Sequence, residues 1–367
     1  MKEPRRQRSQ GTAPTRENLG RAVPPRIAKA LPRTRLFARL DALDAQPLTW
    51  VAGTAGAGKT VLLASYLQAR ALPTLWYRVR AADAEPASFF AGLREAAQLI
   101  GIPNADTLPL LTGEYTGGEA TFTRCFFERL AASTPASFTV VLDDFQQVSP
   151  EAPLQRLLAA LIEDLPPGLR LFVLSRTEPY TGFSRARATR SLGLIGGEEL
   201  RLSTEETHGL IRLSDDLQLG QDSIHAIEHE AQGWAAGVVL LLEHQRRAGH
   251  RSPSSPGPGD AMFDYFATEV LEGCSPELRD FLLRTAIVPD FDVSLANRLT
   301  RAPDPEALLH TLVNRNLFIY IHGGATERYQ YHPLFRAFLL SRAPALLGTA
   351  WEEAEQCGGA GKQEGAE

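Results

Sequence analysis

The strongest constraint on the fold of this chain is the pattern G-x-x-x-x-G-K-T, which runs from Gly53 to Thr60. A short apolar run precedes the pattern, and a helix-forming stretch without Gly or Pro follows it. A strand, a glycine-rich loop and a helix in this order are typical of a phosphate-binding loop, whose successive backbone N–H groups point at an anion. The pattern therefore predicts a nucleotide-binding domain in which helices flank a parallel sheet.

The residues of this loop have distinct expected roles. Gly53, Gly56 and Gly58 allow the backbone angles and the close approach that a polyphosphate requires. Lys59 is expected to reach the β- and γ-phosphates, and the Thr60 hydroxyl is expected to ligate Mg²⁺. The helix that starts near Lys59 adds unpaired N–H groups and the positive end of its dipole. The expected nucleotide-binding set in the loop is Gly53, Thr54, Ala55, Gly56, Ala57, Gly58, Lys59, Thr60 and Val61.

Two further apolar runs end in charged residues. One ends in Asp143 and Asp144, and the other ends at Arg176. Ligands bind outside the carboxyl ends of parallel strands, and neighbouring side chains of a strand point in opposite directions. We therefore assign Asp143 to Mg²⁺ and Asp144 to positioning or deprotonating the attacking water. The planar guanidinium of Arg176 suits the γ-phosphate. Asp144, Lys59 and Arg176 are the predicted catalytic residues.

Each of these charged residues also has an ordinary structural interpretation. Acidic pairs often end a strand by capping the next helix, and Arg176 could be a simple surface arginine. The phosphate-binding loop favours the functional interpretation for all three, because the ends of these strands and the loop are expected at the same edge of the sheet.

The order of apolar runs and helix-period stretches predicts a P-loop NTPase domain of the α/β class over residues 31–202. The expected strands are residues 48–52, 74–79, 138–142, 171–175 and 192–195. The expected helices are residues 60–69, 88–100, 121–132 and 154–163.

After Leu200 the pattern becomes mainly helical. Residues 203–206 predict a capping box, which would open a helical subdomain over residues 203–250. Residues 251–260 have the Ser, Pro and Gly content of a linker. A winged-helix domain over residues 261–345 is predicted from helices at 263–272, 276–286, 305–315 and 332–343 and a hairpin at 317–322 and 328–331.

Composition restricts the classes of function. A net charge of −5 does not argue for nucleic-acid binding by the whole molecule. The cysteines Cys125, Cys274 and Cys357 are too far apart for a disulfide framework or a zinc site, which favours a reducing compartment. The first residues lack the apolar stretch of a secretory signal, and the longest apolar run, about nine residues, is shorter than the ~20 that span a bilayer. We therefore expect a cytoplasmic protein without a membrane partner, with a disordered basic arm at 1–30 and a disordered tail at 346–367.

Together these motifs resemble the STAND class of signalling ATPases, most closely its MalT-like branch of LuxR-family transcriptional regulators. Residues 32–36 resemble the segment of that family that cups the adenine, and residues 141–145 and 174–179 resemble its metal strand and its sensor strand. Residues 233–237 resemble a motif of the helical subdomain, and residues 331–335 resemble part of the winged helix.

The resemblance implies a switch that binds ATP or ADP with Mg²⁺ and hydrolyses ATP slowly. Arg35 would belong to the adenine-nucleotide site, and His332 would meet the phosphates of ADP in a closed, resting state. From the residues alone, a histidine before a proline at a helix start is more often structural. Exchange of ADP for ATP would open the domains and lead to self-association. A nucleotide shifts such an equilibrium only through different affinities for the two states.

Members of this family usually continue into a helical-repeat sensor and often into a helix-turn-helix DNA-binding domain. The residues after the expected winged helix resemble neither, so we expect a shortened relative or a truncated reading frame that meets DNA only indirectly, through a domain absent here. Two other functions stay open. One is a P-loop kinase that phosphorylates a small molecule, and the other is a DNA-binding or scaffold protein with a vestigial nucleotide site.

Overall fold

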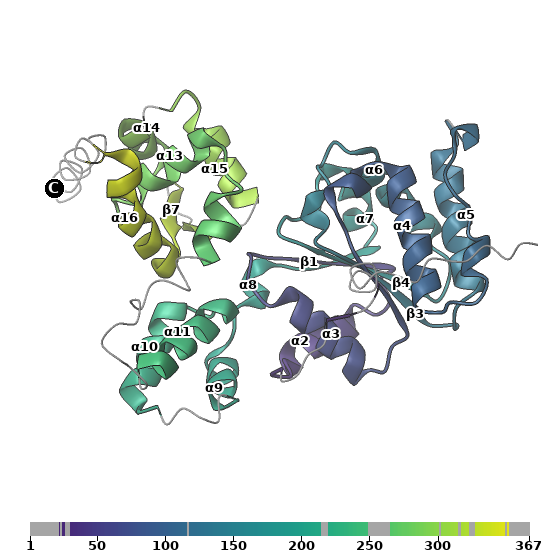
Figure 1. Ribbon diagram of the computed structural model, residues 1–367, viewed down its shortest axis with the longest axis horizontal. Helices are drawn as coiled ribbons and strands as arrows, with labels where there is room; N and C mark the ends of the chain where they lie inside the picture. Colours follow the sequence, from purple (N-terminus) through teal and green to yellow (C-terminus); the bar gives the residue numbers. More distant parts are fainter. Residues whose placement is uncertain are drawn as a thin grey trace, which may run out of the picture.

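The computed structural model describes residues 22, 24–25, 30–115, 117–213, 219–248, 265–300, 302–314, 317–322, 327–348 and 351. The predicted linker, nearly all of the predicted basic arm and most of the predicted tail lie outside the described residues. Figure 1 shows an α/β lobe beside two smaller, mainly helical units. Among the described helices, none has the length and apolar character needed to cross a membrane.

A five-stranded parallel sheet forms the centre of the α/β lobe, in the order β2-β3-β4-β1-β5. Its strands are β1 Leu48–Ala52, β2 Thr74–Arg78, β3 Phe138–Asp143, β4 Leu169–Ser175 and β5 Leu192–Ile195. All five were predicted, and β4 lies between β3 and β1. The carboxyl ends of these three strands are therefore neighbours, with Ala52 beside Ser175 and Leu142 beside Val173.

Helices cover both faces of this sheet (Figure 1). One face carries α2 Thr34–Ala42 and α3 Lys59–Ala69, whose buried residues form one core with one side of the strands. The other face carries α4 Pro86–Leu99, α5 Glu119–Ala132, α6 Pro153–Leu161 and α7 Ser184–Ala188, which share the larger core. Short 3₁₀ turns lie at Ala81–Ala84, Ala105–Thr107, Gly113–Tyr115, Phe145–Gln147, Ile162–Asp164 and Thr181–Phe183.

The helical subdomain follows α8 Gly197–Leu200 and consists of α9 Thr204–Arg212, α10 Gln221–Ala231 and α11 Ala235–Ala248. The predicted capping box at its start is present. The Ser203 hydroxyl accepts a bond from the Glu206 amide at 3.2 Å, and Glu206 Oε2 accepts one from the Ser203 amide at 3.0 Å. A small apolar core, which includes Ile227 and Val238, holds the three helices together.

The last unit combines helices with an antiparallel hairpin, as predicted for a winged helix. It has one helix more than the prediction, α14. Its elements are the π-helical turn η7 Ala267–Leu271, α13 Pro276–Thr285, α14 Val293–Thr300, α15 Pro305–Asn314, β6 Ile319–His322, β7 Arg328–Tyr331 and α16 Pro333–Leu347. Buried aromatic rings, among them Phe266, Phe318 and Phe335, fill its core.

Candidate nucleotide-binding site

The phosphate-binding loop leaves β1 and enters α3, as its sequence predicts. Gly56 and Gly58 have φ angles of +72° and +85°, in the left-handed region that glycine adopts without strain. Gly53 is needed for a different reason, since a Cβ there would lie 2.7 Å from a side-chain carbon of Leu200. The Ala57 amide closes the loop on the Thr54 carbonyl at 3.2 Å.

The structure brings together the two residues that we assigned to magnesium. Thr60 Oγ1 lies 3.3 Å from both carboxylate oxygens of Asp143, although 83 residues separate them. A hydroxyl and a buried carboxylate are hard oxygen donors, which fit Mg²⁺, and this ion keeps several waters and binds substrate phosphates as well. Burial and the neighbouring Asp144 charge raise the pKa of Asp143 to about 6. A bound cation would favour the ionised carboxylate.

Lys59 lies at the end of the loop, where it is the first residue of α3. Its Nζ donates to the carbonyls of Gly53 and Thr54 at 2.7 and 2.9 Å. Burial, together with the positive charge of Arg176, lowers the pKa of Lys59 to about 8. Lys59 and Arg176 are therefore close enough to interact electrostatically, and both contribute positive potential where the β- and γ-phosphates are expected.

Gln146, which was not predicted from the sequence, joins the two remaining predicted catalytic residues. Its Nε2 donates to Asp144 Oδ1 at 3.0 Å, and its Oε1 accepts from the Arg176 amide at 3.1 Å. Asp144 has a φ of +59° and also forms an ion pair with Arg78 at 3.4 Å. The only sequence signal for Gln146 was its position two residues after Asp144 at the acidic strand end.

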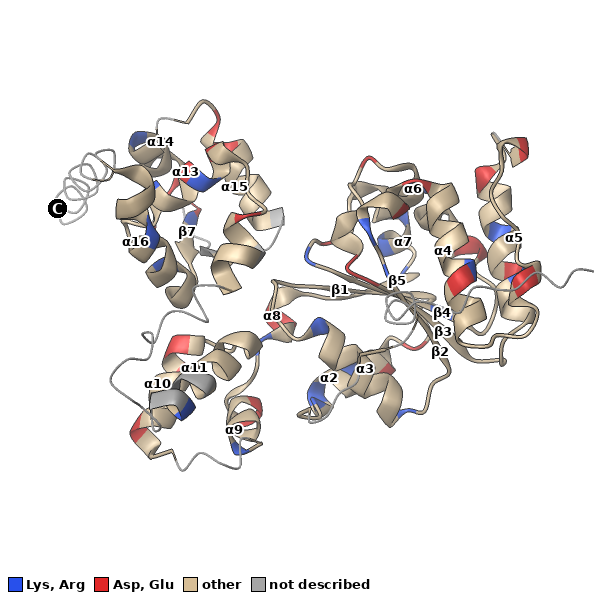
Figure 2. Cartoon of the chain, viewed as in Figure 1, with Lys and Arg blue, Asp and Glu red and all other residues tan. Residues whose placement is uncertain are grey.

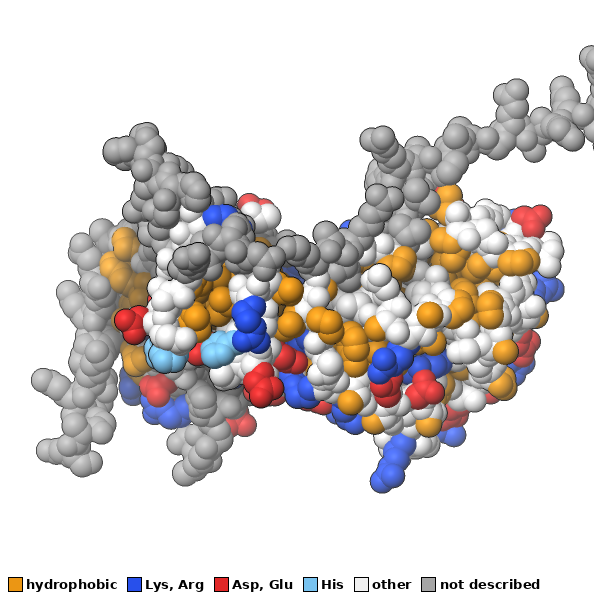
Figure 3. All heavy atoms as spheres, turned by 90° about the horizontal axis from the view of Figure 1, so that it is seen from below, with side chains coloured by type: hydrophobic (Ala, Val, Ile, Leu, Met, Phe, Trp, Pro, Cys, Tyr) orange, Lys and Arg blue, Asp and Glu red, His pale blue; other side chains and the backbone are white. Residues whose placement is uncertain are grey.

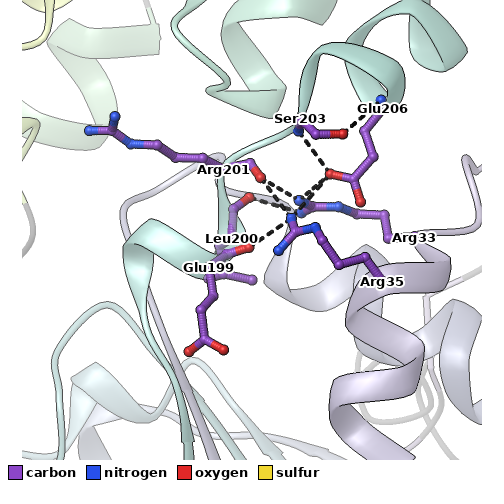
Figure 4. Close-up of polar contacts among 7 residues, drawn as sticks. All are labelled: Arg33, Arg35, Glu199, Leu200, Arg201, Ser203 and Glu206. Carbon is purple, nitrogen blue, oxygen red and sulfur yellow. Dashed lines mark hydrogen bonds and ion pairs between the residues drawn. The ribbon is translucent and has the colours of Figure 1, made fainter.

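Arg35 lies at the junction of α2, α8 and α9 (Figure 4). It donates to the carbonyls of Glu199 and Arg201, both at 3.0 Å. The neighbouring Arg33 is buried and donates to Glu206 Oε2 at 2.9 Å. In this structure both arginines connect the segment before the sheet to the start of the helical subdomain.

His332 is fully buried at the start of α16. Its Nδ1 accepts from the Leu334 amide at 3.2 Å, and its Nε2 lies 3.0 Å from the Ala231 carbonyl at the end of α10. These partners require a neutral ring that donates through Nε2. Burial lowers the pKa of His332 to about 4, which agrees with that form. The ring therefore joins the winged-helix unit to the helical subdomain.

The helical subdomain contacts the phosphate-binding loop directly. The Ala236 amide donates to the Gly56 carbonyl at 3.0 Å, and Trp234 Nε1 donates to the Ala55 carbonyl at 2.9 Å. Both donors belong to residues 233–237, for which the sequence predicted a place in the helical subdomain but no contact with the loop.

Known proteins resemble this chain both in its winged-helix unit and in its α/β lobe. Residues 267–350 match the family of MalT winged helix domains. Over 328 residues, the chain is 26% identical to the HTH-type transcriptional regulator MalT of Yersinia pestis (strain Pestoides F). It is 27% identical to that of Yersinia enterocolitica, again over 328 residues. Each alignment covers 87% of this chain and 36% of the relative, so the chain spans little more than a third of the length of these relatives.

Among solved structures, a Walker-type ATPase of Pyrococcus abyssi superimposes with a TM-score of 0.56. The match covers 84% of this chain and 95% of that chain at 17% identity, so it shows a shared fold. The comparisons confirm the predicted resemblance to MalT-like regulators and the predicted P-loop NTPase fold with a winged-helix domain. They support nucleotide binding, whereas the roles of individual residues stay predictions.

Proposed function

We propose that this chain is an adenine-nucleotide switch, which binds ATP or ADP with Mg²⁺, hydrolyses ATP slowly and changes the placement of its helical units. The observation that carries this proposal is the pairing of Thr60 with Asp143 beside a glycine loop that holds a partly buried lysine. Hydroxyl, carboxylate and ammonium in this arrangement are what a magnesium-bound polyphosphate requires.

Each residue has a role in the proposed site. Thr60 and Asp143 would hold Mg²⁺, which when bound supplies positive charge to the phosphate oxygens. Lys59 would leave the Gly53 and Thr54 carbonyls for the β- and γ-phosphates. Asp144, oriented by Gln146, would position the attacking water, and Arg176 would pair with the γ-phosphate.

The proposed switch acts through the units that cover the loop. A contact between His332 and the phosphates of ADP requires Nε2 to leave the Ala231 carbonyl, so we propose that contact for the ADP-bound form. In the ATP-bound form the units would separate and the chain would self-associate. Because the relatives are transcriptional regulators, we propose that such a switch controls DNA binding by a domain outside this chain.

Isothermal calorimetry with ADP and ATP in the presence of Mg²⁺ tests nucleotide binding. Lys59→Ala should weaken both affinities by about 10- to 100-fold, the range for losing a hydrogen bond to a charged group. Arg70→Ala is the matched control, since Arg70 lies just after the other end of α3 and pairs with Asp41 at the surface. Undiminished affinity in the Lys59 variant would contradict the proposal.

The two alternative functions have less support. A P-loop kinase needs an acceptor pocket beside the γ-phosphate. The cavity of about 550 Å³ between the starts of α4, α5 and α6 contains no residue of the predicted site in its lining. The DNA-binding alternative would favour a surface rich in basic residues. Figure 2 instead shows acidic and basic residues interspersed over the α/β lobe and the two helical units, and the described part of the face in Figure 3 shows the same mixture. Among the described residues of that face, no basic stripe of the kind that duplex binding favours is visible.

A further inference from the structure

Trp234 lies between the phosphate-binding loop and the winged-helix core. Its indole Nε1 donates to the Ala55 carbonyl in the loop at 2.9 Å. Its ring stacks on Phe266 with centroids 5.2 Å apart and meets Phe318 edge-on at 4.9 Å. Only 5% of Trp234 is exposed. One side chain of the helical subdomain thus touches both other units of the molecule.

The tip of the phosphate-binding loop is part of the same packing. Ala55 is buried within the hydrophobic cluster that contains the winged-helix core. A Cβ added at Gly56 would lie 2.5 Å from Ala236 Cβ, and 2.9 Å from both Trp234 Nε1 and the Tyr265 hydroxyl. The helical subdomain and the winged-helix unit therefore meet at one glycine of the nucleotide site.

The sequence around Trp234 is suited to this contact. Gly233 has a φ of +77°, and a Cβ there would lie 2.8 Å from the Leu202 carbonyl oxygen. Gly237 leaves room for the indole, because a Cβ would lie 2.6 Å from a ring carbon of Trp234. The two glycines on either side thus place the ring where its N–H reaches the loop.

We infer that Trp234 is a positioning residue that couples the shape of the phosphate-binding loop to the docking of the winged-helix unit. This inference rests on the proposed nucleotide switch. In a phosphate-binding loop the amides point toward the anion and the carbonyls point away. Trp234 and the Ala236 amide hold two successive carbonyls, those of Ala55 and Gly56, so they keep the loop in an orientation that presents its amides.

The coupling must act in both directions, because binding free energies are reciprocal. If the docked units favour the binding-ready loop, then nucleotide binding changes how firmly the units dock. His332 reinforces the link, since its ring lies 5.6 Å from that of Trp234 while it bonds to the end of α10. A rearrangement at the phosphates would therefore reach the winged helix through Trp234.

Calorimetry on the full chain with Mg²⁺ and ADP separates this inference from the proposed function. Trp234→Phe keeps an aromatic ring but removes the indole donor, and it should weaken ADP affinity about five- to tenfold, as expected for one buried hydrogen bond. Tyr331→Phe is the control, since it removes a buried hydroxyl bond to Thr285 inside the winged-helix core. This control should leave ADP affinity unchanged. Equal affinity in wild type and Trp234→Phe would overturn the inference, whereas no ADP binding by wild type would overturn the proposed function.

A second measurement does not depend on how well the variant folds. The chain has four tryptophans, so its indole N–H signals are few in a ¹H–¹⁵N spectrum, and the signal missing in Trp234→Phe identifies Trp234. Adding ADP to the wild type should shift this signal more than that of Trp76, which is buried in the sheet core away from the helical units. If Trp234→Phe does not fold, triple-resonance spectra of the wild type assign the Trp234 signal among the four instead. A Trp234 signal that stays in place at saturating ADP would contradict the coupling.

Discussion

At the scale of single residues, Asp143 shows how a binding site reduces stability. Its raised pKa means that the folded chain takes up a proton between about pH 4 and pH 6, where the unfolded chain is ionised. The contribution of Asp143 to the free energy of unfolding therefore falls as the pH rises through that window. At pH 7, Asp143→Asn should raise the free energy of unfolding of the nucleotide-free chain by about 1–3 kcal/mol and abolish further stabilisation by Mg²⁺.

Urea denaturation at pH 7 and pH 5, with and without Mg²⁺ and ADP, measures both effects of Asp143→Asn. The gain in the free energy of unfolding of Asp143→Asn over wild type should shrink by about half at pH 5, since wild-type Asp143 is then mostly protonated. Glu151→Gln removes the same charge from an exposed position and serves as the control. A nucleotide-free Asp143→Asn protein that is less stable than wild type would argue against this account.

His332 should make the winged-helix packing sensitive to acid. Its pKa is depressed from 6.5 to about 4, so the unfolded chain binds more protons across that interval and stability falls as the pH drops. From pH 7 to pH 5, the loss should be about 2 kcal/mol. His332→Asn should be less stable at pH 7 because the bond to Ala231 is lost, but it should show a flatter pH dependence.

Denaturation midpoints at several pH values test this prediction. His225→Asn is the control, because His225 is exposed on α10 and its replacement should keep the wild-type slope. If His332→Asn has the same slope as wild type, the buried ring does not titrate as the structure implies.

At the scale of elements, Glu206 holds the start of α9 on the α/β lobe (Figure 4). Its Oε2 accepts from the Ser203 amide, from Arg33 and from Arg35. Burial would raise the pKa of Glu206, but the bonds from Arg33 and the Ser203 amide outweigh it and lower the pKa. Glu206→Gln leaves the buried Arg33 charge without its carboxylate partner, so this substitution should lower the free energy of unfolding by about 2–4 kcal/mol.

Glu199→Gln offers a close comparison for the Glu206 variant. Glu199 also pairs with an arginine of α2, Arg39, but both side chains are at least 40% exposed. Such a surface pair is worth less than about 1 kcal/mol. Equal losses in the two variants, measured by urea denaturation, would show that Arg33 does not depend on Glu206.

The sequence was sufficient for elements whose signals are local. Every strand was predicted within two residues at each end, because apolar runs bounded by turn residues mark buried strands. Helices α4 and α6 begin at Pro86 and Pro153, slightly earlier than predicted, since proline fits the first turn of a helix. Helix α2 was missed because the prediction treated residues 32–36 as a ligand-binding segment, although Leu36, Phe37 and Leu40 bury one helix face.

At the scale of the whole molecule, prediction was limited by contacts between distant segments. Asp143 was correctly predicted to lie near the phosphate-binding loop, because the carboxyl ends of parallel strands share one edge of the sheet. No local pattern links Trp234 to Ala55, which are 179 residues apart, or His332 to Ala231, which are 101 apart. These contacts depend on how rigid units dock, and that docking is decided by the shapes of surfaces that the sequence pattern does not specify.

That docking leads to a prediction about the shape of the chain in solution. Gly56 and Gly58 both have positive φ, so replacing either by alanine strains the loop similarly and should weaken nucleotide binding. Their surroundings differ. A methyl group at Gly56 would lie 2.5 Å from Ala236 Cβ, whereas at Gly58 the nearest atom, Ala235 Cβ, is 3.7 Å away.

Only Gly56→Ala should therefore separate the helical units from the α/β lobe. Small-angle X-ray scattering of the nucleotide-free protein should give a larger radius of gyration for Gly56→Ala than for wild type, and an unchanged radius for Gly58→Ala. Because both variants carry the same backbone strain, loss of nucleotide binding alone cannot produce that difference. Identical scattering from the two variants would mean that the units are not held to the α/β lobe through the tip of the phosphate-binding loop.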